Sequence, residues 1–179
     1  MGNNWKITDT LTKVFADEVP DGQGSIRLST LHRETVSCVI AYFGAADWGR
    51  YWKVSVKAPE KIETRLRRVE LVPSAYPCHK EQDDNYLRIV PGMYPDLLRD
   101  LDTEDDGADK KYLTKEVPGQ WRSLWLDVTV DTELAGGDYA IVIETETEDG
   151  EKETLKADLH VVDASLPPQK LLHTEWFHS

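Results

Sequence analysis

Apolar and polar residues alternate with a period of two along much of this chain, which is the pattern of half-buried β-strands. The alternation is clearest at residues 51–57, 121–130, 139–146 and 153–162. Residues 36–43 are nearly apolar on both faces and therefore predict a central strand. Residues 62–72 alternate more loosely and carry several charges, so we expect one exposed face or a sheet edge there.

Helical periodicity is scarce in the sequence. Only Tyr94–Leu101, with Pro95 at the first helical position, predicts one short turn of helix. Asp149-Gly150 predicts a hairpin turn between the last two strands. Strand-like segments about ten residues apart, with Gly and Pro between them, predict an all-β fold. We expect a sandwich of about 7–9 antiparallel strands, either immunoglobulin- or fibronectin-like or jelly-roll-like.

The pattern changes near the C-terminus. Residues 1–163 are expected to form the sandwich, and residues 164–170, which contain Pro167-Pro168, predict a short stiff linker. Residues 171–179 are apolar and rich in strand-forming residues. We expect this last segment to be the first strand of a further domain.

The charge balance excludes several classes of partner. The formal net charge is −12 and the isoelectric point is about 4.8. Nucleic acids and anionic membrane surfaces need a basic face, so neither is expected as a partner. The first residues show no basic and apolar signal pattern, and no apolar run is long enough to cross a bilayer. These features predict a soluble, cytoplasmic protein.

Two cysteines, Cys38 and Cys78, are too few for a zinc site. In the cytoplasm we expect both to be reduced, with a disulfide between them as the less favoured alternative. The sequence contains no phosphate-binding glycine loop and no nucleophile elbow. No cofactor and no catalytic residue are therefore expected within this chain.

The segment Gly44–Trp52 is a candidate glycan platform, because sugars stack their C–H faces on aromatic rings and bind carboxylates and guanidinium groups. Its candidate binding residues are Trp48, Arg50, Tyr51 and Trp52. The favoured alternative is structural: Trp52 points into the core, and Trp48 either covers the end of the sandwich or packs on a further domain.

An acidic run from Asp102 to Asp109 imitates the first half of a calcium loop. The candidate ligands are Asp102, Glu104 and Asp106. The twelfth position of such a loop requires a bidentate glutamate and is occupied here by Leu113. A solvated acidic loop is therefore favoured over a calcium site.

Several segments together resemble the glycoside hydrolase family 123-like proteins, a group that includes domains of unknown function with a catalytic C-terminal barrel. The resemblance is carried by Val90–Leu98, Trp121–Val128, Gly136–Tyr139, Leu159–Pro167 and Leu172–His178. It implies an N-terminal β-sandwich followed by a barrel that cleaves N-acetylhexosaminides with an Asp-Glu pair. That pair would lie beyond Ser179. The resemblance also implies that Trp176 and His178, at the first barrel strand, face the sugar.

Three hypotheses follow from these observations. The first is a non-catalytic accessory domain that packs against the catalytic barrel and frames its active site. The second is a carbohydrate-binding module that uses Trp48, Tyr51 and Trp52, and the third is a calcium-dependent interaction domain. Under the first, an apolar face would be left bare in this chain, so we expect self-association through the C-terminal segment or the sandwich end.

Overall fold

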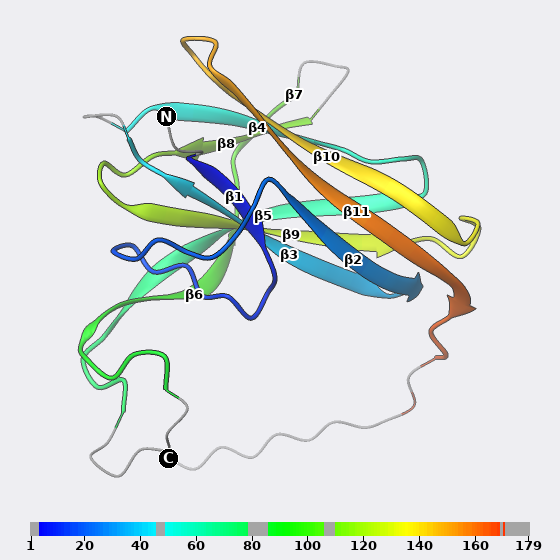
Figure 1. The fold of residues 1–179 in the computed structure, drawn as a ribbon, viewed down its shortest axis with the longest axis horizontal. Coiled ribbons are helices and arrows are strands. Elements are labelled where there is room, and N and C mark those ends of the chain that lie inside the picture. Colours follow the sequence, from blue (N-terminus) through cyan, green and yellow to red (C-terminus); the bar gives the residue numbers. More distant parts are fainter. Residues whose placement is uncertain (1–3, 46–48, 79–85, 106–109, 169, 171–179) are drawn as a thin grey trace.

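The computed structural model describes residues 4–45, 49–78, 86–105, 110–168 and 170. They form a β-sandwich with no helix in the described part, which confirms the all-β prediction. The five-stranded sheet runs in the order β1 (Trp5–Thr8), β3 (Thr35–Phe43), β9 (Trp121–Val130), β5 (Ile62–Ser74) and β6 (Gly92–Asp100). The six-stranded sheet runs in the order β2 (Ser25–His32), β11 (Lys152–Ser165), β10 (Gly137–Thr147), β4 (Tyr51–Lys57), β8 (Lys110–Lys115) and β7 (Thr103–Asp105). Figure 1 shows the two layers.

The strand count and pairing differ from the prediction. The described residues contain eleven strands instead of about 7–9. Strands β2 and β11 pair in parallel, with Ser25 opposite Lys156, whereas the other named strand pairs are antiparallel. The predicted hairpin is confirmed: β10 and β11 are joined by a turn in which Gly150 has a φ of 82°.

The predicted helical turn at Tyr94–Leu101 is wrong, because these residues belong mainly to strand β6. Strand β5 supplies antiparallel partners for β6, and the register shifts between Glu70 and Leu71 where Pro95 pairs. A proline lacks the N–H that a ladder needs, so it is tolerated on an edge strand at such an irregularity. The charges of strand β5 suggested either an exposed face or a sheet edge. The strand lies between β9 and β6, so the edge alternative is wrong.

The main core lies between the two sheets. Aromatic packing at one end joins them: Trp5 stacks on Tyr42 with centroids 4.9 Å apart and meets Trp52 edge-on at 5.2 Å. Alternate residues of β9, β10 and β11 fill the rest, among them Leu124, Leu126, Ile141, Ile143, Leu155 and Leu159. Each fully buried apolar side chain of this size contributes roughly 1.5–3 kcal/mol.

A second apolar cluster lies on the outer face of the five-stranded sheet. Val14, Val39, Ala41 and Trp121 are buried there, with Phe43 and Trp125 packed against them. Val14 belongs to residues 9–20, called here the N-terminal segment, which crosses this face and is fixed by a hydrogen bond from Trp121 N to Ala16 O. Strands β3 and β9 are therefore covered on both faces. Within the described residues, nothing resembles a helix long and apolar enough to span a membrane.

Candidate functional site

The predicted aromatic platform is divided between two faces of β4. Trp52 points into the core, where its ring is 2% exposed and its Nε1 donates to Glu116 Oε1 at 2.7 Å. Tyr51 lies on the opposite face, 48% exposed, with the Lys115 ammonium 5.0 Å from its ring centroid. Trp48 lies outside the described residues. Trp52 therefore has no ring face to offer a sugar, and Tyr51 cannot form a coplanar pair with it.

Arg50 is held by two carboxylates. Its Nη1 lies 2.7 Å from Glu151 Oε2, and its Nε lies 3.6 Å from Glu116 Oε2. The Glu116 side chain is 1% exposed, and a buried carboxylate needs such a cationic neighbour. A side chain at Gly49 would approach Glu116 O to 2.2 Å, so the chain passes tightly at this point. This cluster fastens the loop before β4 to the residue that follows β8.

The described part of the acidic run contains no metal site. Asp102 and Glu104 are exposed, and Glu104 pairs with Lys53 at 2.8 Å. No group of three His, Cys, Asp or Glu side chains that could hold a metal occurs in the described residues. Asp106 lies outside them, as do Trp176 and His178.

Both cysteines are free. Cys38 is fully buried on β3, and desolvation raises the pKa of its thiol to about 12. A buried thiol with such a pKa stays protonated at neutral pH, which disfavours its use as a nucleophile. Cys78 is half-buried, and its Sγ lies 3.5 Å from Ile89 O.

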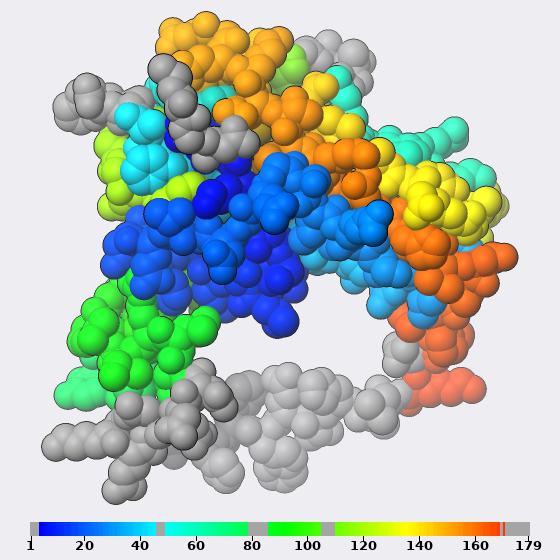
Figure 2. All heavy atoms as spheres, in the orientation of Figure 1, coloured from blue at the N-terminus to red at the C-terminus, as the bar shows by residue number. Residues whose placement is uncertain are grey.

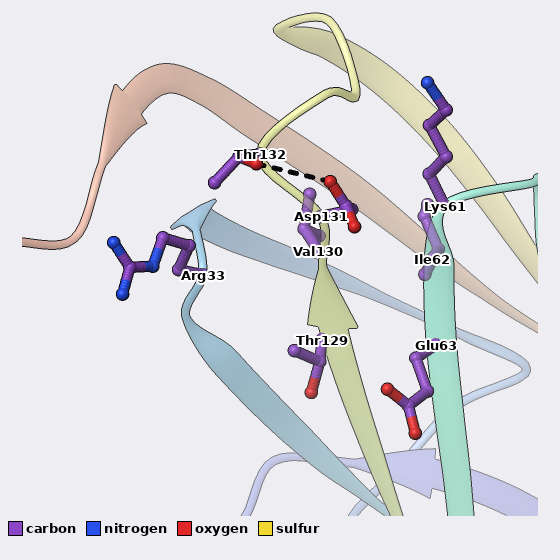
Figure 3. Close-up of a pocket in the computed structure, with 8 residues that line it drawn as sticks. All are labelled: Arg33, Lys61, Ile62, Glu63, Thr129, Val130, Asp131 and Thr132. Carbon is purple, nitrogen blue, oxygen red and sulfur yellow. Dashed lines mark hydrogen bonds between the residues drawn. The ribbon is translucent and has the colours of Figure 1, made fainter.

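An open groove of about 580 Å³ lies where the turns before β3 and β5 meet the end of β9 (Figure 3). Arg33 and Lys61 line it and have φ values of 64° and 69°. Figure 3 shows their charged ends pointing away from each other. Asp131 accepts from Glu133 N at 2.9 Å, which lowers the pKa of its carboxyl. Arg33 and Lys61 point apart, and Asp131 accepts a hydrogen bond within its own turn. These charged groups therefore do not converge on a common binding site in the groove.

The β5–β6 hairpin carries the most exposed apolar surface of the described chain. Its far end projects beyond the two sheets (Figure 1). We call residues 70–78 and 86–98 the hairpin lobe. Seven of the eleven large apolar side chains that are exposed in the described residues belong to it: Tyr76, Tyr86, Leu87, Ile89, Val90, Met93 and Leu97. Exposed apolar side chains gathered in this way mark interaction surfaces.

The hairpin lobe is fastened to the N-terminal segment. Arg88 donates to Asp17 at 2.7 Å, contacts Glu18 at 2.7 Å and lies 3.9 Å from the Phe15 ring centroid. Phe15 meets Tyr94 edge-on at 5.8 Å. Figure 2 shows the blue N-terminal segment beside the green lobe. A groove of about 560 Å³ runs between them, lined by Phe15, Val72, Pro73, Leu87 and Tyr94 among others.

The sequence-based prediction missed this surface. Residues 86–90, Tyr-Leu-Arg-Ile-Val, hold four large apolar side chains around Arg88. They do not belong to any of the strands. An apolar run that does not belong to a strand of the sandwich is not expected in the core. Such a run was therefore a usable sign of an exposed apolar surface.

Comparison with known proteins gives a likeness of fold. No family model and no curated protein matches the sequence. Among solved structures, a family 123 glycoside hydrolase from Clostridium perfringens superposes with a TM-score of 0.63 at 10% identity, over 91% of this chain. This chain corresponds to only 28% of that protein's length. The likeness shows a β-sandwich fold shared with part of that enzyme.

Weaker likenesses extend to other solved structures. The C-terminal domain of the Streptococcus agalactiae AgI/II polypeptide BspA matches with a TM-score of 0.42 at 14% identity, over 88% of this chain and 49% of that one. The major pilin subunit BcpA of Bacillus cereus matches with a TM-score of 0.41 at 8% identity, over 88% of this chain and 39% of that one. Scores this low carry no argument about function.

Proposed function

We propose that this chain is a non-catalytic accessory domain that packs against the catalytic barrel of a glycoside hydrolase and frames its active site. The observation that carries the proposal is the likeness of fold, over 91% of this chain, to part of a family 123 glycoside hydrolase. The sequence resemblance stated above points to the same family. The active-site carboxylates would belong to the barrel.

The hairpin lobe supports the proposal physically. A domain that works by packing needs an apolar surface that its own fold leaves uncovered. Leu87 is 71% exposed and Val90 is 57% exposed, although the ion pairs of Arg88 hold the chain between them in place. An ordered apolar surface costs little conformational entropy on docking, which favours a stable contact between domains. We therefore assign the contact with the barrel to this lobe.

The proposal places a catalytic barrel next to this chain, so the test compares this chain alone with a longer product that carries both. The chain alone should not hydrolyse nitrophenyl N-acetylhexosaminides, whereas the longer product should. Leu87→Asp and Leu97→Asp should lower the melting temperature and activity of the longer product. Neither change should unfold the chain alone, because both side chains are exposed, and circular dichroism measures this. Val162→Asp, at an exposed apolar residue of β11, is the matched control because it lies in the six-stranded sheet, whereas the strands of the lobe belong to the five-stranded sheet.

Two results would contradict the proposal. One is hydrolysis by the chain alone. The other is a longer product in which the lobe variants and Val162→Asp behave alike. The same variants also test self-association: the isolated chain should elute as a concentration-dependent dimer, and Leu87→Asp should restore the monomer.

A further inference from the structure

A small cavity lies under the N-terminal segment, on the outer face of the five-stranded sheet. Its volume is about 200 Å³. Strands β3, β5 and β9 form its floor through Val39, Val69, Ser123 and Trp125. One wall is the stretch from Thr10 to Val14, and the opposite wall is β6 from Pro95 to Leu98. The cavity is therefore formed by four strands of one sheet together with the N-terminal segment.

The floor holds a hydroxyl group, that of Ser123. Ser123 is 3% exposed as a whole residue and lines the cavity. A serine hydroxyl both donates and accepts hydrogen bonds, so a ligand in the cavity can bond to it.

Trp125 is a rigid part of the same floor. Its Nε1 donates to Asp127 Oδ1 at 2.7 Å. Asp127 also accepts from Ser37 Oγ at 2.7 Å and from Arg67 Nη2. Because the indole donor is already used, Trp125 can offer only its ring surface to a ligand. The three donors to Asp127 hold that ring in one orientation.

The walls add polar groups that donate and polar groups that accept hydrogen bonds. Asp9 Oδ1 accepts from Leu11 N and Thr12 N, both at 2.9 Å, so the turn that carries Thr10 is held in place. Lys13 at the rim is a hydrogen-bond donor, and Asp96 on β6 is an acceptor. Thr10 can do both.

We propose that this cavity binds one pyranose ring of a neutral sugar. A pyranose offers an apolar C–H face to the surface of Trp125 and hydroxyls that both donate and accept. Those hydroxyls match Ser123, Lys13 and Asp96. Cavities for drug-sized ligands span about 300–1,000 Å³, so one of this size admits a single ring and no longer chain. The site is independent of the proposed docking role and differs from the loop that the sequence suggested.

The test uses the isolated chain and NMR titration with glucose, galactose, N-acetylglucosamine and N-acetylgalactosamine. At least one sugar should shift the indole signal of Trp125 and the backbone amide of Ser123. Ser123→Ala, which removes one oxygen and little packing, should weaken that sugar's affinity about tenfold. Asp96→Asn should weaken it less, and Tyr51→Ala, on the other sheet, should leave it unchanged.

Trp125→Ala should abolish binding, and circular dichroism and thermal melts would show whether this variant is folded. The interpretation does not depend on it, because Ser123→Ala tests the same cavity. The proposal fails if none of the four sugars shifts the Trp125 signal at high millimolar concentration. It fails equally if shifts map to the six-stranded sheet, or if Ser123→Ala binds like the unchanged chain.

Discussion

The outer faces of the two sheets differ in polarity. On the six-stranded sheet, outward side chains form exposed ion pairs such as Lys57–Glu144 at 2.7 Å and Lys152–Glu146 at 3.1 Å. On the five-stranded sheet, Trp121 and the residues around it form a second apolar cluster beneath the N-terminal segment. Exposed ion pairs contribute about 0–1 kcal/mol each, so the charged face mainly interacts with water. The apolar face contributes to stability and also carries the candidate binding surfaces.

Truncating a residue from each face should give the largest contrast. Trp121 is 7% exposed and packs against Phe43 with centroids 5.4 Å apart. We expect Trp121→Ala to lower the free energy of unfolding by about 3–5 kcal/mol, because it opens a cavity under the N-terminal segment. Lys152→Ala should change it by less than about 0.5 kcal/mol. Urea unfolding followed by circular dichroism measures both, and equal effects would contradict the distinction between the faces.

Carboxylates on the two faces should also differ. Asp127 accepts hydrogen bonds from Ser37, Trp125 and Arg67, and its side chain is 16% exposed. Asp127→Ala should cost about 2 kcal/mol, because it leaves three donors short of an acceptor in a partly buried site. Glu144→Ala, whose side chain is 45% exposed in its ion pair, should cost under about 0.5 kcal/mol. A smaller loss for Asp127→Ala than for Glu144→Ala in urea titrations would refute this ranking.

The smallest effect concerns the contact between the N-terminal segment and the hairpin lobe. The hydrogen bond from Arg88 holds the pKa of Asp17 below its ordinary value of 3.8. A carboxyl with a depressed folded pKa stabilises the contact fully above its unfolded pKa. That contribution is lost as the pH falls through the folded value. Lowering the pH from about 6 to about 2 should therefore shift the NMR signal of the Arg88 guanidinium.

In Asp17→Asn the same acid titration should shift the Arg88 signal less than in the original chain, and the ion pair with Glu18 is the contact that remains. An unchanged Arg88 signal in the original chain would show that the Asp17 contact does not form in solution. The six-stranded sheet again supplies the comparison. Glu146, in its exposed ion pair with Lys152, belongs to the six-stranded sheet, so Glu146→Gln should leave the acid-induced shift of the Arg88 signal unchanged.

Local patterns in the sequence predicted the long strands well. Residues 121–130 and 139–146 alternate because one face of each strand meets the core, and this signal is contained in neighbouring residues. The same alternation, with Val54 on the same face, favoured a core position for Trp52. The short strands β1 and β7 span four and three residues, which is too little for a period of two to stand out.

Long-range contacts explain what the sequence could not predict. Strand β6 was expected to be partly helical because Pro95 suits a helix start, and only pairing with β5 decides otherwise. The cavity beside Trp125 depends on the N-terminal segment crossing β9, more than a hundred residues later in the chain. In β9 the tryptophans lie on the face opposite Leu124 and Leu126. That arrangement was a usable sign that the strand is covered on both sides.

The parallel pairing of β2 with β11 also limits when the sandwich can fold during its synthesis on the ribosome. Ser25 pairs with Lys156, so β2 cannot join its neighbour until the last strand has been made. At about 5–20 residues per second, the ribosome needs on the order of ten seconds to span that interval. During this time β2 has no partner in its sheet, while β3 and the strands after it accumulate. We expect the nascent chain to close its sandwich only after Ser165 leaves the exit tunnel, so the interval before that moment is when this domain is most exposed to chaperones and proteases.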